Sequence, residues 1–427
     1  MKALVSRWGD FVARSPRRAI WIAFALVFSA ALYETLWWPL HDFPGAFWHS
    51  SDRGLDITIG QANAARAGWR EILGFWHGPM LHGHGYFRPL TSMLFVLQYR
   101  LFGENDRLWT LFSIPFHLGV VAMLFVTTLR FSPGPLPRQL AAAAIGAILF
   151  AAPGFADRSV QNWVICWWPA QHESLSLIFG LGMLCATDAH CRAPNRANAL
   201  AAVGLFFLAI CVKEMGYLPA MVSCLLLLRA RRWPLLLTIA ACGLAFFAYR
   251  HAVLGALAYQ TNGFRRAALW QRPLAEWDNL IQQLLRARNH LLFSAVATAV
   301  ALSLRRRSRA DRILAAAASY VLPAALIEGA PWESLFLTGL LATLGLAVLA
   351  ALTAGLILAI RRARVLECVL FYTLSVAATI GFPPNFAWYR YWWTVSGAML
   401  AAIAFTELGQ RLRAGGLNTR QGVRASR

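Results

Sequence analysis

Long apolar runs separated by short arginine-rich connections dominate this chain and restrict what it can fold into. The first run, residues 20–40, is about as long as a helix needs to be to cross a bilayer. Of the 427 residues, 58% are hydrophobic and only 14% are charged, and the mean hydropathy is +0.51. A soluble globular chain of this length is far less apolar. The sequence therefore predicts an all-α, polytopic membrane protein.

The net charge of +21 does not indicate a nucleic-acid partner. The arginines lie in short clusters between apolar runs, and not on one amphipathic face with interleaved aromatic residues. The first run has no small-residue cleavage site, so we expect an uncleaved first helix. The seven cysteines show no paired CxxC spacing, which predicts packed, reduced thiols and no structural zinc.

The arginine clusters predict the topology. Basic residues gather at positions 7–18, 130–138, 192–196, 229–232, 305–312, 361–364 and from 411 onward. The positive-inside rule makes these connections cytoplasmic, and each interval between them has room for two spans. We therefore expect about twelve transmembrane helices with both termini inside. Residues 1–410 should form one transmembrane domain, and residues 411–427 a basic cytoplasmic tail.

This topology leaves two long connections outside, a first outer loop over residues 41–107 and a second over residues 250–290. The first loop holds about a third of the 19 acidic residues of the chain. It also holds three tryptophans, Trp48, Trp69 and Trp76, a residue type suited to the headgroup level of a membrane. A large, acidic first outer loop is therefore a candidate for carrying chemistry.

Two cations beside outer helix ends are candidates for binding phosphate. Lys213 lies between two apolar runs and, apart from Lys2, is the only lysine of the chain. Burying an ammonium is costly, so such a group pairs with a partner, faces a polar cavity or binds a charged ligand. Arg88, in Tyr86-Phe87-Arg88-Pro89, has the planar donor pattern that pairs with phosphate oxygens. The alternatives are a lysine that snorkels at a helix end and an arginine on a lipid headgroup.

Further polar residues lie on the same predicted outer side. Asp42, directly after the first run, could take a proton from a hydroxyl, or it could be an acid at a helix end. His172 and Glu173 begin another apolar run, and Glu214 follows Lys213. One histidine and one carboxylate are too few for a metal site, so we expect His172 and Glu173 to bind by hydrogen bonds. Arg390, near the last helix, is a further cation beside an outer helix end.

These segments, read in order, resemble the GT-C superfamily of integral-membrane glycosyltransferases. The likeness is to the branch of protein O-mannosyltransferases and transmembrane tetratricopeptide mannosyltransferases, without the tetratricopeptide tail. It spans roughly residues 20 to 410. The motifs that carry it are Asp42, Tyr86-Phe87-Arg88-Pro89-Leu90-Thr91, His117, Asn162-Trp163-Val164 with His172-Glu173, Val212-Lys213-Glu214, Tyr249-Arg250 and Tyr389-Arg390-Tyr391.

The resemblance implies an inverting glycosyltransferase with a polyprenyl-phosphate sugar as donor. Asp42 is then the catalytic base, although relatives commonly carry two adjacent acids where this chain has His41-Asp42, so Asp52 and Asp56 stay as alternatives. The donor phosphate would be bound by Arg88, Lys213 and Arg390, and the sugar or acceptor by Tyr86, His172, Glu173 and Glu214. No cofactor is implied, and a divalent metal is neither implied nor excluded.

Other functions remain open on the sequence. A lipid or solute transporter would also have about twelve helices, although transporters place polar groups near the bilayer midplane and often in two related halves. A glycan polymerase or ligase would use the same lipid-linked donor, and an inactive relative would only bind. The acceptor could be a lipid, a glycan or a protein. The preference for arginine over lysine indicates a GC-rich bacterial genome, and hence the inner or plasma membrane with the active site on its outer, periplasmic side.

Overall fold

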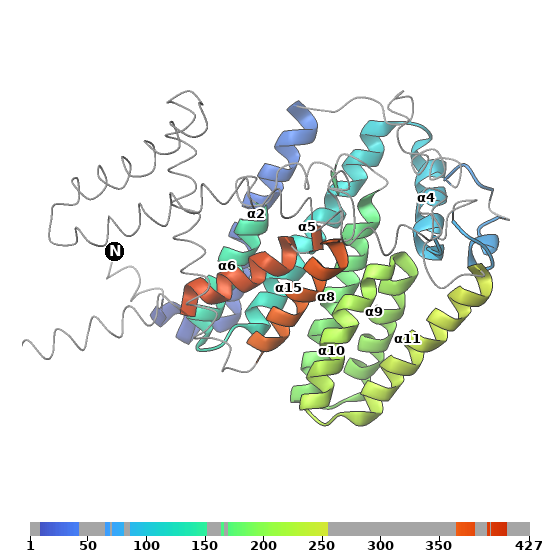
Figure 1. Cartoon of the computed structure of the whole chain (residues 1–427). Coiled ribbons are helices and arrows are strands. Elements are labelled where there is room, and N and C mark those ends of the chain that lie inside the picture. The colour runs from blue at the N-terminus through green and yellow to red at the C-terminus, as the bar shows by residue number, and fades with distance from the viewer. Residues whose placement is uncertain are drawn as a thin grey trace, which may run out of the picture. The chain divides into compact units, whose positions relative to one another are not determined.

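The computed structural model describes residues 9–41, 65–68, 71–80, 86–151, 164–165, 170–254, 364–380, 391–392 and 394–407. All of these except Glu407 belong to one compact unit, formed by Met1–Phe264 with Ala359–Thr406. The regular elements in the described residues are helices, and these residues contain no strand (Figure 1). The predicted all-α class is confirmed.

The main helices are α2 (Pro16–His41), α4 (Pro89–Phe102), α5 (Asp106–Phe131), α6 (Leu136–Ala151), α8 (Gln171–Arg192), α9 (Arg196–Val212), α10 (Tyr217–Arg229), α11 (Trp233–Leu254) and α15 (Val365–Ile380). The structure also describes two short 3-10 helices, η1 (Leu73–Trp76) and η3 (Glu214–Gly216), and the apolar helix Thr394–Glu407.

Four of the described helices are long and apolar enough to cross a membrane. They are Pro16–Tyr33 within α2, α5, α8 and α11, and three shorter apolar helices, α6, α9 and Thr394–Glu407, accompany them. The chain is thus compatible with a membrane protein. The total of twelve spans remains a prediction, because residues 255–363 lie outside the described part of the chain.

Helix α8 lies at the centre of the described bundle (Figure 1). It packs against α5, α9 and α10, while α2 and α6 pack against α5, α11 against α9 and α10, and α15 against α10. Gly180 allows α10 to come close to α8, since a Cβ at this position would lie 2.5 Å from Cγ of Pro219. Both polar sites described below include residues of α8.

Short connections make α8, α9, α10 and α11 run alternately in opposite directions. Asn195 is the N-cap of α9, since its side chain accepts a hydrogen bond of 2.7 Å from the backbone N–H of Asn198. The beginnings of α8 and α10 therefore lie with the ends of α9 and α11. We call this end of the bundle the site end, and the opposite end, where α8 and α10 finish, the arginine end.

The candidate residues and the basic clusters separate between these two ends. Arg88, His172, Glu173, Lys213 and Glu214 are brought together at the site end. The basic residues Arg130, Arg192, Arg229 and Arg364 line one pocket at the arginine end. The 22 residues of α8 place these ends about 33 Å apart, close to the thickness of a bilayer core. Which end faces the cytoplasm remains the prediction of the positive-inside rule.

Candidate functional site

The corner between α9 and α10 positions two of the candidate residues. Helix α9 ends at Val212, Lys213 has an extended backbone (φ −159°, ψ 146°), and η3 begins at Glu214. Gly216 permits this tight corner, because a Cβ there would lie 2.7 Å from the backbone carbonyl carbon of Ala209. From the corner, Lys213 reaches α8 and Glu214 reaches the residue before α4. The two adjacent side chains thus connect different helices.

Lys213 forms a buried ion pair with Glu173. Its ammonium donates to Oε1 of the Glu173 carboxylate, and the two residues are 1% and 0% exposed. The other carboxylate oxygen, Oε2, accepts a hydrogen bond of 2.7 Å from the indole N–H of Trp392. Lys213 therefore does not extend to the membrane surface. It belongs to the class of buried charges that are stabilised by a partner.

Arg88 and Glu214 form a second ion pair. Nε and one terminal nitrogen of Arg88 donate to Oε2 of Glu214, at 3.1 and 2.9 Å. Arg250, at the end of α11, approaches the other carboxylate oxygen at 3.8 Å. Burial raises the pKa of Glu214, but the positive charges of Arg88 and Arg250 outweigh it and hold this pKa below its usual value. We conclude that Glu214 is ionised at neutral pH.

Tyr86 packs on the other side of Arg88. The guanidinium carbon lies 4.6 Å from the centre of the Tyr86 ring, a cation–π contact. Burial raises the pKa of the Tyr86 phenol, and the nearby Arg88 opposes this only in part. Tyr86 is therefore a neutral hydroxyl at neutral pH.

His172 lies between the two ion pairs. Its Nε2 is 3.4 Å from a terminal nitrogen of Arg88 and 3.6 Å from Oε1 of Glu173. His172 is 2% exposed. The ring therefore connects the pair Arg88–Glu214 with the pair Lys213–Glu173, and the candidate residues form one continuous cluster. We call Arg88, His172, Glu173, Lys213, Glu214 and Arg250 the site-end cluster.

The charges of the site-end cluster do not cancel among its described members. With the paired groups counted as ionised, Arg88, Lys213 and Arg250 carry three positive charges against two negative charges on Glu173 and Glu214. Most of the cluster is fully buried, whereas the side chain of Glu214 keeps 18% exposure and that of Arg250 keeps 10%. Glu214 and Arg250 therefore mark its more accessible side. An anion that enters there would meet a surplus positive charge in a poorly solvated environment.

Neighbouring polar contacts involve residues of α4, α5 and α8. Gln98 and Gln171 exchange hydrogen bonds between their amides, at 2.7 and 2.5 Å. The hydroxyl of Tyr391 lies 2.7 Å from Nδ1 of His117 and accepts a hydrogen bond of 3.3 Å from Ser174. His117 and Tyr391 belong to the motifs of the resemblance, and the structure shows that they touch each other although 274 positions separate them.

The other predicted site residues cannot be placed in this way. Asp42, its alternatives Asp52 and Asp56, and Arg390 lie outside the described residues. Asp42 directly follows α2 in the sequence. Phe24 in the first half of α2 packs on Phe125 near the end of α5, with ring centroids 5.6 Å apart. The two helices are therefore antiparallel, and α2 finishes on the side where α5 begins.

Sequence reasoning missed three residues with prominent contacts. Trp392 follows the motif Tyr389-Arg390-Tyr391, but nothing in the sequence relates its indole to Glu173. Arg250 belongs to the motif Tyr249-Arg250, but the sequence assigns no role to this arginine. Its approach to Glu214 depends on how α11 packs. Asp188 does have a signal in the sequence. It lies four residues before Arg192 on an apolar helix, a spacing that predicts an ion pair.

The described residues show no group of three or more His, Cys, Asp or Glu side chains placed to hold a metal ion. Six of the cysteines, Cys185, Cys191, Cys211, Cys224, Cys242 and Cys368, are free thiols in the structure.

No protein-family model, no curated protein and no solved structure was found to match this chain. The fold and the site define a helical protein with candidate membrane spans and a buried, charged cluster at one end of its bundle.

Proposed function

We propose that this protein is an inverting membrane glycosyltransferase of GT-C type that takes a sugar from a polyprenyl-phosphate donor. The observation that carries the proposal is the site-end cluster. Arg88 and Glu214 are 126 positions apart, and Lys213 and Glu173 are 40 positions apart, yet all four meet through His172. These are the residues that the resemblance assigns to the donor and to the sugar or acceptor.

The proposed reaction is a single displacement. The acceptor hydroxyl oxygen attacks the anomeric carbon while the bond from this carbon to the phosphate oxygen breaks, with inversion of configuration. Asp42 takes the hydroxyl proton, and Asp52 and Asp56 are its alternatives. The polyprenyl phosphate leaves with the electron pair of the broken bond, so its charge grows from about one to about two negative charges.

The site-end cluster suits this change in charge. A phosphate leaving group needs charge stabilisation more than it needs a proton, and fixed cations in a poorly solvated site provide it without reorganisation. Arg88 and Lys213 are fixed because Glu214 and Glu173 hold them. The surplus positive charge among the described residues balances a phosphodiester before the reaction. We propose Arg390 as a further phosphate-binding residue.

The remaining members have supporting roles in this proposal. Glu173 positions Lys213, because both of its carboxylate oxygens already have donors. His172 keeps the two ion pairs together. Tyr86 and Glu214 lie beside Arg88, and we assign them to the binding of the sugar or the acceptor. The proposal needs no cofactor.

The proposal includes a place in the cell. We place the site-end cluster on the outer, periplasmic side of a bacterial inner or plasma membrane, with both termini in the cytoplasm and about twelve spans. The gathering of Arg130, Arg192, Arg229 and Arg364 at the other end of the bundle supports this orientation.

The test is transfer by the purified protein in lipid nanodiscs. A panel of radiolabelled polyprenyl-phosphate sugars is added, and release of polyprenyl phosphate is measured with and without membrane extract as the acceptor. We expect release with one donor and a loss of about 100-fold or more in Arg88→Gln, which removes fixed donors to the leaving group. Arg107→Gln is the matched control, since Arg107 is exposed and begins α5 at the same end. A wild-type rate in Arg88→Gln, or no release from any donor, contradicts the proposal.

One observation favours a second candidate, a lipid or solute transporter. Buried ion pairs occur at both ends of the bundle, Lys213–Glu173 at one and Asp188 with its arginines at the other. Paired charges at two ends could open and close alternately. Loss of labelled lipid from one leaflet of a vesicle without hydrolysis of the sugar phosphate would support transport and not transfer. A polymerase or ligase would share the donor release and differ only in its product.

A further inference from the structure

A second charged cluster lies at the arginine end, around Asp188 of α8. The Asp188 side chain is fully buried, and three guanidinium groups contact its carboxylate. The distances are 2.9 Å from Arg192, 2.8 Å from Arg364 and 3.4 Å from Arg130. Glu367, on α15, is also buried and accepts a hydrogen bond of 2.6 Å from Arg229. The two carboxylates thus fix four arginines from four separate segments.

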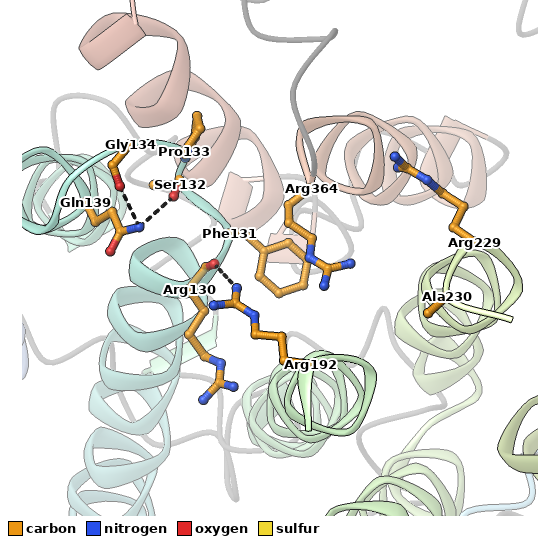
Figure 2. Close-up of a pocket in the computed structure, with 10 residues that line it drawn as sticks. All are labelled: Arg130, Phe131, Ser132, Pro133, Gly134, Gln139, Arg192, Arg229, Ala230 and Arg364. Carbon is orange, nitrogen blue, oxygen red and sulfur yellow. Dashed lines mark hydrogen bonds between the residues drawn. The ribbon is translucent and has the colours of Figure 1, made fainter. Parts of the chain in front are cut away.

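The four arginines surround a pocket of about 480 Å³ (Figure 2). Arg130 comes from the last turn of α5, Arg192 and Arg229 are the last residues of α8 and α10, and Arg364 directly precedes α15. The rest of the lining is Phe131, Ser132, Pro133, Gly134, Gln139 and Ala230. Among the described residues, all the charged side chains that line this pocket are therefore arginines.

The arginines keep donors for a ligand. Their side chains are 34%, 53%, 44% and 21% exposed for Arg130, Arg192, Arg229 and Arg364, whereas both carboxylates are 0% exposed. Each guanidinium has five N–H donors, and its contacts in the described part of the chain engage only one or two of its nitrogens. The carboxylates hold the arginines from the protein side and leave their outer sides accessible.

The pocket has an excess of positive charge. Four guanidinium groups face two carboxylates, which leaves two positive charges among the described residues. Three helices, α5, α8 and α10, end here and two, α6 and α15, begin here. With about half a charge at each helix end, the dipoles together remove only about half a positive charge. The local charge therefore remains positive.

The backbone at Arg364 supports a functional reading of this arrangement. Arg364 has φ of +78°, in the left-handed region that residues other than glycine seldom adopt. Such a conformation is unfavourable for a residue with a side chain and persists only where the surrounding structure enforces it. The guanidinium of this residue lies 2.8 Å from the Asp188 carboxylate. Local strain of this kind occurs preferentially at binding sites.

We propose that this pocket binds a phosphate group through Arg130, Arg192, Arg229 and Arg364. Planar guanidinium groups match phosphate oxygens with two parallel hydrogen bonds, and several together bind more than one phosphate oxygen. The pocket lies at the finishing end of α8, about one bilayer thickness from the site-end cluster. Its ligand is either the headgroup of an anionic phospholipid or a soluble phosphate ester.

The experiment measures lipid retained by the purified full-length protein. Nanodiscs contain either phosphatidylcholine alone or phosphatidylcholine with cardiolipin, and native mass spectrometry counts the cardiolipin that stays bound after release into detergent. We expect cardiolipin retention in the wild type and a loss of about tenfold or more in its affinity in Arg192→Gln and in Arg229→Gln. Arg196→Gln removes an exposed positive charge from the start of α9 at the same end, outside the pocket, and should retain the lipid.

Further measurements distinguish a lipid headgroup from a soluble phosphate ester and define the results that would overturn the proposal. Inorganic pyrophosphate that raises the unfolding temperature of the wild type but not of Arg192→Gln, without any cardiolipin retention, would support the pocket with a soluble ligand. An equal loss of cardiolipin in Arg192→Gln, Arg229→Gln and Arg196→Gln would overturn the proposal, since it would show attraction by the whole basic face. If Arg192→Gln does not fold, Arg192→Lys keeps the charge beside Asp188 but not the planar donors, and wild-type retention in it would also overturn the proposal.

Discussion

The ammonium of Lys213 donates directly to the carboxylate of Glu173, 40 positions earlier in the chain, and both side chains are buried. The pair joins the corner after α9 to the first turn of α8. Neither charge can be removed alone without leaving the other in a poorly solvated environment. The pair is therefore a structural requirement of the site-end cluster as well as part of its proposed chemistry.

The first prediction separates these two roles. Lys213→Met alone should lower the free energy of unfolding by about 3–5 kcal/mol, because it leaves the Glu173 carboxylate buried and unpaired. The double variant Lys213→Met with Glu173→Gln should recover most of this loss, since the glutamine oxygen can still accept from Trp392. Thermal unfolding in detergent measures both. Equal destabilisation in the single and double variants would show that the pair is not the cause. Proposed transfer should stay absent in the stable double variant.

Much of the site was predictable because it depends on topology. The positive-inside rule assigns the arginine clusters to one side of the membrane and the connections between them to the other. This predicted topology is enough to group Arg88, His172, Lys213 and Glu214. The all-α class follows in the same way from the apolar runs.

The pairing of these residues was not predictable. The sequence makes Arg88 and Lys213 candidates for phosphate binding and leaves a partner for Lys213 as one alternative, but it does not identify the carboxylate that each one meets in the structure. Which acid meets which base depends on the rotation and depth of each helix, and an apolar run determines neither. The partners of Asp188 were not predictable from the sequence for the same reason, because they come from α5, from α8 and from the residue before α15.

The second prediction concerns the catalytic base. Asp42→Asn should abolish sugar transfer while leaving folding and donor binding unchanged, because only proton removal from the acceptor needs the carboxylate. Release of polyprenyl phosphate reports transfer, and retention of a labelled donor reports binding. Asp52→Asn and Asp56→Asn are the matched comparisons within the same loop. An active Asp42→Asn beside an inactive Asp52→Asn or Asp56→Asn would move the base and leave the proposed reaction intact.

The third prediction is a pH dependence from Glu214. Its folded-state pKa is below the usual value near 4.5, so the ionised form stabilises the fold above that value. This contribution is lost as the pH falls from about 4.5 through the lower folded-state pKa. Thermal unfolding from pH 7 to pH 3 should therefore show a steeper loss in the wild type than in Glu214→Gln. Parallel curves would mean that Arg88 and Arg250 do not stabilise the carboxylate.

A control for this comparison is Glu104→Gln. Glu104 pairs with Arg66 at 2.6 Å, but both side chains are substantially exposed, at 33% and 42%. Exposed pairs contribute little, so we expect less than about 1 kcal/mol of destabilisation at pH 7. A larger effect would indicate that any loss of a carboxylate at this end weakens the fold.

The fourth prediction tests the corner that carries Lys213 and Glu214. In Gly216→Ala the new Cβ would meet the backbone of Ala209, which cannot move like a flexible side chain, so α9 and η3 must separate. We expect a loss of about 1–3 kcal/mol in stability and weaker donor binding, because both ion pairs depend on the corner. In Gly204→Ala, on the preceding helix α9, the new Cβ meets no atom within 4 Å, and the change should be neutral or stabilising by up to about 1 kcal/mol. If Gly216→Ala matches Gly204→Ala in unfolding temperature and donor retention, the close approach does not position the cluster.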